Sequence, residues 1–211
     1  MRANTCFTVI GSSILSLSAA LAGCGGAVSE EVTTAKEQSA LSAESSHYLP
    51  PLPSPALAVP AGNHVAFHYD AIGVQIYACS AVGAGYGWVF QAPDATLYNH
   101  GGHAVGKHYA GPTWESNDGS KVVGAKLAAA TPDPASIPWL LLGAVSHAGT
   151  GKMDGVKYIQ RLETAGGIAP AGGCDASTVG ASARVPYTAT YYFSVADGDD
   201  GDDGDDANDD R

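Results

Sequence analysis

Between residues 106 and 124 the sequence gathers the side chains best suited to chemistry. They are an imidazole, an indole and two carboxylates, contributed by His108, Trp114, Glu115 and Asp118. An imidazole beside a carboxylate can act as an acid or a base, and an indole offers a stacking face. Because Gly-Pro and Asp-Gly dipeptides in this stretch favour chain reversals, these side chains are expected to lie together near one end of a sheet.

One hypothesis for these residues is a small secreted hydrolase or lyase. His108 would be the base, with Glu115 or Asp118 as its orienting or acid partner. Gln160 or Arg161 would stabilise the negative charge that develops during the reaction. The same side chains also fit a scaffold, with the indole in the core, one carboxylate in a turn and the other paired with a lysine. The sequence leaves open whether the protein is an enzyme.

The sequence contains only weak candidates for a metal site and no complete cofactor-binding motif. His100 and His103 flank two glycines in a predicted turn, which could bring them near His108, and this suggests weak metal-ligand candidates. Metal sequestration by these histidines and the Asp-rich tail is a third hypothesis, although the tail lacks the ligand spacing of a calcium loop. Neither the glycines around residue 85 nor Gly-Thr-Gly-Lys at residues 149–152 forms a complete nucleotide-binding motif, so no cofactor is predicted.

Charge is concentrated at one end of the 211-residue chain. The formal net charge is −11, and the residues from Asp197 onward contribute nine Asp and one Arg, or −8, which leaves −3 for the rest. No basic surface remains to hold phosphates, so nucleic-acid binding is not expected. A segment of Asp, Gly, Ala and Asn cannot bury an apolar core, and residues 197–211 are predicted to be a disordered tail.

The amino end predicts export. A single early Arg is followed by an apolar stretch over residues 6–21 and then by Leu21-Ala22-Gly23-Cys24. This arrangement is typical of a signal peptide, here residues 1–23. Its end resembles a bacterial lipoprotein lipobox, which implies lipidation of Cys24 and attachment to the membrane of the cell envelope, facing the periplasm or the cell surface. Ordinary secretion is the alternative.

Two cysteines remain once Cys6 is removed with the signal peptide and Cys24 carries lipid. Cys79 and Cys174 in an oxidising compartment most simply form one disulfide. A catalytic thiol is the alternative. A zinc site is less favoured still, since neither cysteine has a second one at short spacing.

Alternating apolar and polar residues predict an all-β domain over residues 57–196, preceded by a Ser/Thr/Pro-rich tether over residues 24–56. The alternation is clearest over residues 185–195 and 64–70. Further strand candidates are residues 74–79, 86–91, 104–109, 113–116, 121–127, 139–145 and 156–163. Short strands separated by Gly and Pro indicate a single-domain antiparallel sandwich or barrel with Gly/Pro-rich loops. An alternative places one helix at residues 159–164.

Several motifs, in order along the chain, resemble one family. They include residues 73–79 (Gly-Val-Gln-Ile-Tyr-Ala-Cys), 137–141 (Ile-Pro-Trp-Leu-Leu), 159–161 (Ile-Gln-Arg) and 185–189 (Val-Pro-Tyr-Thr-Ala). Together with the stretch at residues 108–124 they are similar to a family of secreted bacterial and fungal proteins catalogued as domain of unknown function 3455. The resemblance implies an exported single domain with both cysteines in matching places, and it brings no established activity.

The leading hypothesis is therefore a cell-envelope lipoprotein that displays its β-domain as a binding or structural module. Ligand capture would use Tyr, Trp and Gly-rich loops, with Trp114, Tyr109 and Gln160 as the candidate ligand-binding residues. The expected partners are the membrane, through the lipid, and an unidentified envelope or extracellular ligand.

Overall fold

Eight antiparallel strands close into one barrel, in which every strand is hydrogen-bonded to the next and β8 returns to β1. The structure is a computed structural model that describes residues 49–198. The strands are β1 (Asn63–Val82), β2 (Gly85–Tyr98), β3 (Ala104–Tyr109), β4 (Thr113–Ser116), β5 (Lys121–Ala130), β6 (Trp139–Ala148), β7 (Tyr158–Gly166) and β8 (Ser182–Ala196). The predicted all-β fold is confirmed.

Two details differ from the sequence prediction. The candidates at residues 64–70 and 74–79 are parts of the single strand β1, because the pairing of β1 with β2 and with β8 continues through Gly73 without a break. The segment predicted by the alternative as a helix, residues 159–164, lies within strand β7. The chain reversal predicted at Asp118-Gly119 is confirmed. It lies in the four-residue connection from β4 to β5, where Asp118 accepts hydrogen bonds from both the backbone N–H and the hydroxyl of Ser120 at 2.7 and 2.6 Å.

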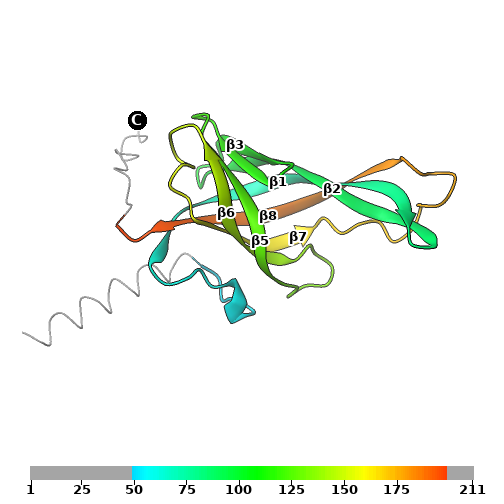
Figure 1. Ribbon diagram of the computed structural model, residues 1–211, viewed down its shortest axis with the longest axis horizontal. Helices are drawn as coiled ribbons and strands as arrows, with labels where there is room; N and C mark the ends of the chain where they lie inside the picture. The colour runs from blue at the N-terminus through cyan, green and yellow to red at the C-terminus, as the bar shows by residue number, and fades with distance from the viewer. Residues whose placement is uncertain (1–48, 199–211) are drawn as a thin grey trace, which may run out of the picture. The chain divides into compact units, whose positions relative to one another are not determined.

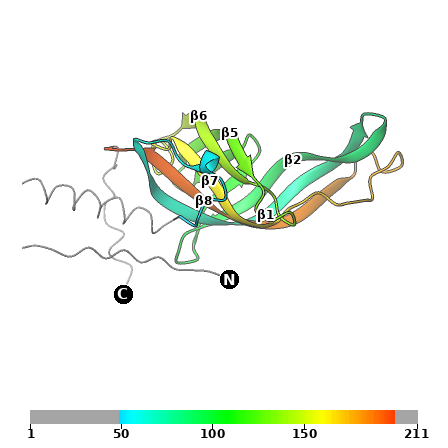
Figure 2. The ribbon, with the colours of Figure 1, turned by 90° about the horizontal axis from the view of Figure 1, so that it is seen from below.

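Three strands extend beyond the barrel and form an arm (Figures 1 and 2). β1 pairs with β2 as far as Val82 and Gly85, whereas β3 pairs with β2 only from Ala95 onward. On the other side of β1, β8 pairs with it from Ser182, and β7 joins β8 only at Tyr187. The outer halves of β1, β2 and β8 therefore continue as a three-stranded ribbon.

The arm carries the predicted disulfide. Cys79 of β1 is bonded to Cys174 in the β7–β8 connection, with their Cα atoms 5.4 Å apart, so this prediction is confirmed. Backbone hydrogen bonds join the same two segments, because Cys79 N–H donates to the Ala181 carbonyl and Gly180 N–H donates to the Cys79 carbonyl. The long β7–β8 connection is therefore fixed along the arm.

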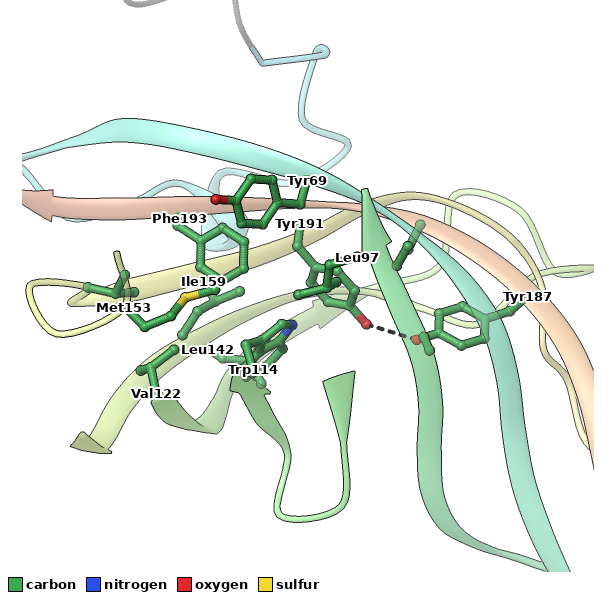
Figure 3. Packing of buried hydrophobic residues seen from close by; sticks show 14 of the residues in the cluster. Tyr69, Leu97, Trp114, Val122, Leu142, Met153, Ile159, Tyr187, Tyr191 and Phe193 are labelled. Carbon is green, nitrogen blue, oxygen red and sulfur yellow. Dashed lines mark hydrogen bonds between the residues drawn. The ribbon is translucent and has the colours of Figure 1, made fainter. Parts of the chain in front are cut away.

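The barrel interior is filled by aromatic and aliphatic side chains from alternate positions of the strands (Figure 3). Trp114 packs edge-on against Tyr191 and Phe193, at ring-centroid distances of 5.3 and 6.4 Å. Gly124 leaves the space that this indole occupies, because a Cβ at position 124 would lie 3.1 Å from Cζ3 of Trp114. The large ring is thus held in one place by its neighbours.

A second apolar cluster covers part of the outer face of the sheet. Leu57, in the 3-10 helix η2 (Pro55–Leu57), is fully buried there against residues of β6, β7 and β8, and Leu49 and Leu52 from the predicted tether also pack against this cluster. Gln160 of β7 secures η2, since its Nε2 donates to the Leu57 carbonyl at 2.7 Å. Its place is therefore on the outside of the barrel.

Several predictions fall on other parts of the chain. The signal peptide, Cys24, most of the tether and nearly all of the Asp-rich tail lie outside the described residues. In the described part, no helix is long and apolar enough to span a membrane.

Candidate functional site

A hollow of about 240 Å³ opens in the barrel interior, next to the point where β2 leaves β3 to join the arm. Residues from every strand except β5, together with the β3–β4 turn, line it. They are Gln75, Phe90, Gln91, Pro93, His108, Gly111, Pro112, Trp114, Leu140, Leu142, Arg161 and Tyr191. Its walls are thus mostly apolar, with a few polar groups among them.

An aromatic stack forms one side of the hollow. His108 and Trp114 face each other across the β3–β4 pair, with ring centroids 4.3 Å apart and planes 12° apart. Tyr191 from β8 meets both rings edge-on, and Figure 3 shows its ring above the Trp114 indole. Because strand side chains alternate between faces, His108 and Trp114 point inward while their neighbours Tyr109 and Glu115 point outward.

His108 is neutral in this setting. Its side chain is only 2% exposed, and burial lowers its pKa to about 3, against the opposing effect of its hydrogen bond to the Thr113 carbonyl. Nδ1 lies 2.9 Å from that carbonyl oxygen, which can only accept, so Nδ1 carries the proton and Nε2 keeps the lone pair. At neutral pH this imidazole is a weak base and a hydrogen-bonding group.

Arg161 brings the formal positive charge into the lining. Its Nε and one Nη donate to the Pro138 carbonyl at 3.1 and 2.8 Å. None of the ion pairs formed within residues 49–198 involves this guanidinium. Its charge reaches Tyr191, where it partly offsets the burial that raises the pKa of the phenol. With His108 neutral, Arg161 is the charged group among the residues that line the hollow.

Two buried donors in the lining have no acceptor. They are Nε2 of Gln75 and Nε1 of Trp114, on side chains that are 2% and 1% exposed. An unsatisfied buried donor costs about 1–3 kcal/mol, and most buried polar groups in proteins are paired. Both side chains line the hollow, so an acceptor bound there would lie beside them.

The structure brings together three of the residues predicted from the sequence, namely His108, Trp114 and Arg161. Glu115 lies on the outer face, where Tyr109 donates to it at 2.8 Å and Lys121 lies 3.2 Å away. The hydrogen bond from Tyr109 is the largest cause that lowers the pKa of Glu115, and the hydrogen bond from Lys121 is the next. Neither Glu115 nor Tyr109 reaches the hollow.

The remaining candidates lie elsewhere. Asp118 closes the β4–β5 turn. Burial raises its pKa, but hydrogen bonds from Ser120 and the Lys152 backbone outweigh this effect, so the pKa of Asp118 lies below its ordinary value. Gln160 lies under η2 on the outer face. His100 and His103 are exposed in the β2–β3 turn, apart from the buried His108, and residues 49–198 contain no group of three or more potential metal-ligating side chains.

Sequence reasoning missed Gln75, Phe90 and the apolar walls of β6. Gln75 had a recognisable signal, since it occupies the same strand face as Tyr77 and Cys79, where an amide must find a partner in the interior. Phe90 had none, because it is half exposed and reaches the hollow only through the path of β2 at the start of the arm.

Comparison with known proteins gives one match. The model of a family described as a protein of unknown function, DUF3455, matches residues 60–194. No curated protein and no solved structure matches the chain.

Proposed function

The chain belongs to the DUF3455 family of proteins of unknown function, and we propose that it is a binding module whose barrel receives a small molecule. The observation that carries this proposal is the pair of unpaired buried donors, on Gln75 and Trp114, at a hollow that also contains Arg161. A mostly apolar concavity with a few convergent polar groups is the usual form of a small-molecule site.

The size of the hollow limits what it receives. Its volume of about 240 Å³ is roughly eight times the ~30 Å³ that one water molecule occupies in the liquid. A ligand of about ten non-hydrogen atoms, such as one substituted ring, fits this space. Eight-stranded barrels are wide enough inside to hold one small ligand.

The geometry does not favour the hydrolase or lyase hypothesis. That mechanism needed His108 beside Glu115 or Asp118, and both carboxylates point away from the hollow. A buried imidazole with a pKa of about 3 would also be a poor base at neutral pH. No reaction is therefore proposed.

We place this module in the bacterial cell envelope, held by a lipid on Cys24 and a tether that ends at the barrel. The support is the signal-peptide pattern with its lipobox-like end, together with a disulfide, which persists in oxidising compartments. The ligand would then be captured outside the cytoplasm.

Filling the hollow tests the binding proposal. Leu140 is a partly exposed lining residue, and Leu140→Trp adds a large ring where the ligand would lie. Calorimetric titration with benzamide and benzoate should show binding to the unaltered protein and at least a tenfold loss in this variant. Leu127→Trp is the matched control, because Leu127 is 59% exposed and is not among the residues that line the hollow. Equal affinities in all three proteins would show that the ring compounds bind elsewhere.

A further inference from the structure

We propose that the ligand is a small monoanion, a carboxylate attached to a flat ring, with its carboxylate directed to Arg161, Gln75 and Trp114. This inference rests on the proposed binding function and specifies the chemistry of that same site. It follows from the charge of the hollow, its hydrogen-bond donors and its apolar wall.

The charge of the lining favours one negative charge on the ligand. Arg161 is cationic, His108 is neutral, and the other lining side chains carry no charge. Among residues 49–198 no carboxylate neutralises Arg161. A monoanion would balance this charge, whereas a dianionic phosphate ester would leave a second negative charge buried without a partner.

The unpaired buried polar atoms on residues that line the hollow are both donors, whereas the other two unpaired buried atoms of the described residues, on Gln160 and Ser194, belong to residues outside the lining. Nε2 of Gln75 and Nε1 of Trp114 have no acceptor, and a guanidinium has five N–H groups, of which the Pro138 carbonyl takes two. Two carboxylate oxygens provide about four lone-pair sites and suit the planar fork of an arginine. An acceptor-only group therefore satisfies what the protein leaves unsatisfied.

The rest of the lining is mostly apolar. Trp114 contributes an indole, Phe90 a half-exposed ring at the arm, and β6 the side chains of Leu140 and Leu142. Aromatic rings pack well against such surfaces in offset or edge-on arrangements. A ring with one carboxylate has about the size that a volume of 240 Å³ accepts.

Benzoate and benzamide separate this inference from the binding proposal, because they share one shape and differ in charge. Calorimetric titration of the full mature protein should show benzoate binding at least tenfold more tightly than benzamide. In Arg161→Gln the preference should disappear, through loss of benzoate affinity, while benzamide affinity changes less than threefold. Retained benzamide binding in this variant also shows that the hollow is still formed.

Two further variants complete the test. Arg161→Lys keeps the charge and loses the planar fork, so it should retain only part of the preference. Lys126→Gln removes one exposed positive charge from β5, outside the lining, and should leave both affinities unchanged. Equal affinity for the two compounds in the unaltered protein overturns the carboxylate inference and leaves the binding proposal standing. Failure of both compounds to bind overturns both.

Discussion

Replacing both bridged cysteines, Cys79→Ala with Cys174→Ala, is expected to lower the free energy of unfolding by about 4–5 kcal/mol. The bridge closes a loop across a sequence separation of 95 residues, and constraining a loop of that length removes a corresponding amount of chain entropy from the unfolded state. Domains of this kind typically have only about 5–15 kcal/mol of stability in total. Denaturant unfolding followed by tryptophan fluorescence measures the change.

The control for this prediction is reduction of the unaltered protein. Reductant should lower its stability by about the same amount and should leave the double variant unaffected, because both act through one bond. A double variant as stable as the oxidised protein would show that the strand pairing of the arm already fixes the β7–β8 connection, with the disulfide contributing little.

Acidification is expected to destabilise the protein through His108. Its pKa is about 3 in the folded state and about 6.5 in an unfolded chain, so between these values the unfolded state binds a proton that the folded state does not. The contribution of neutral His108 to stability is therefore fully present above about pH 6.5 and is lost as the pH drops toward 3. The slope reaches at most about 1.4 kcal/mol per pH unit, which amounts to about 3 kcal/mol by pH 4.

His108→Phe isolates this contribution. Phenylalanine preserves a ring against Trp114 but cannot be protonated, so the loss of stability between pH 7 and pH 4 should be smaller by about 3 kcal/mol than in the unaltered protein. The lost hydrogen bond to Thr113 lowers stability at every pH and does not change this difference. His100→Phe, in an exposed turn, is the matched control. Parallel stability curves for the unaltered protein and His108→Phe would contradict the assignment.

The all-β fold could be predicted from the sequence because it depends on local patterns of residues. Alternation over residues 185–195 correctly predicted that Tyr187, Tyr191 and Phe193 of β8 enter the core, but Tyr192 and Ser194 on the other face of the strand are buried as well. The bounds predicted for β3 and β4 agree with the structure. The closure of the eight strands into a ring could not be predicted in this way. It depends on how β8 pairs with β1, a contact between residues more than a hundred positions apart.

The candidate site could be predicted only in part from the sequence, because turns indicate which residues lie near one another but not the face of the sheet to which each side chain points. His108 and Trp114 fall at paired positions of neighbouring strands and share the interior, whereas Glu115, one residue later, necessarily points out. Gln160 and Arg161 likewise lie on opposite faces of β7. Gln160 supports η2 outside, and Arg161 lines the hollow inside.

The most direct test of the binding site is the indole N–H signal of Trp114 in a ¹H–¹⁵N NMR titration with benzoate. The chain has three tryptophans, and Trp88 already donates its indole N–H to the Gly172 carbonyl at 2.8 Å, while Trp139 lies with the outer cluster. A Trp114→Phe spectrum assigns the signal. The account predicts a saturable downfield shift of the Trp114 signal, as its unpaired donor gains an acceptor, with the other two signals unmoved. A Trp114 signal that does not respond at saturating benzoate would contradict it.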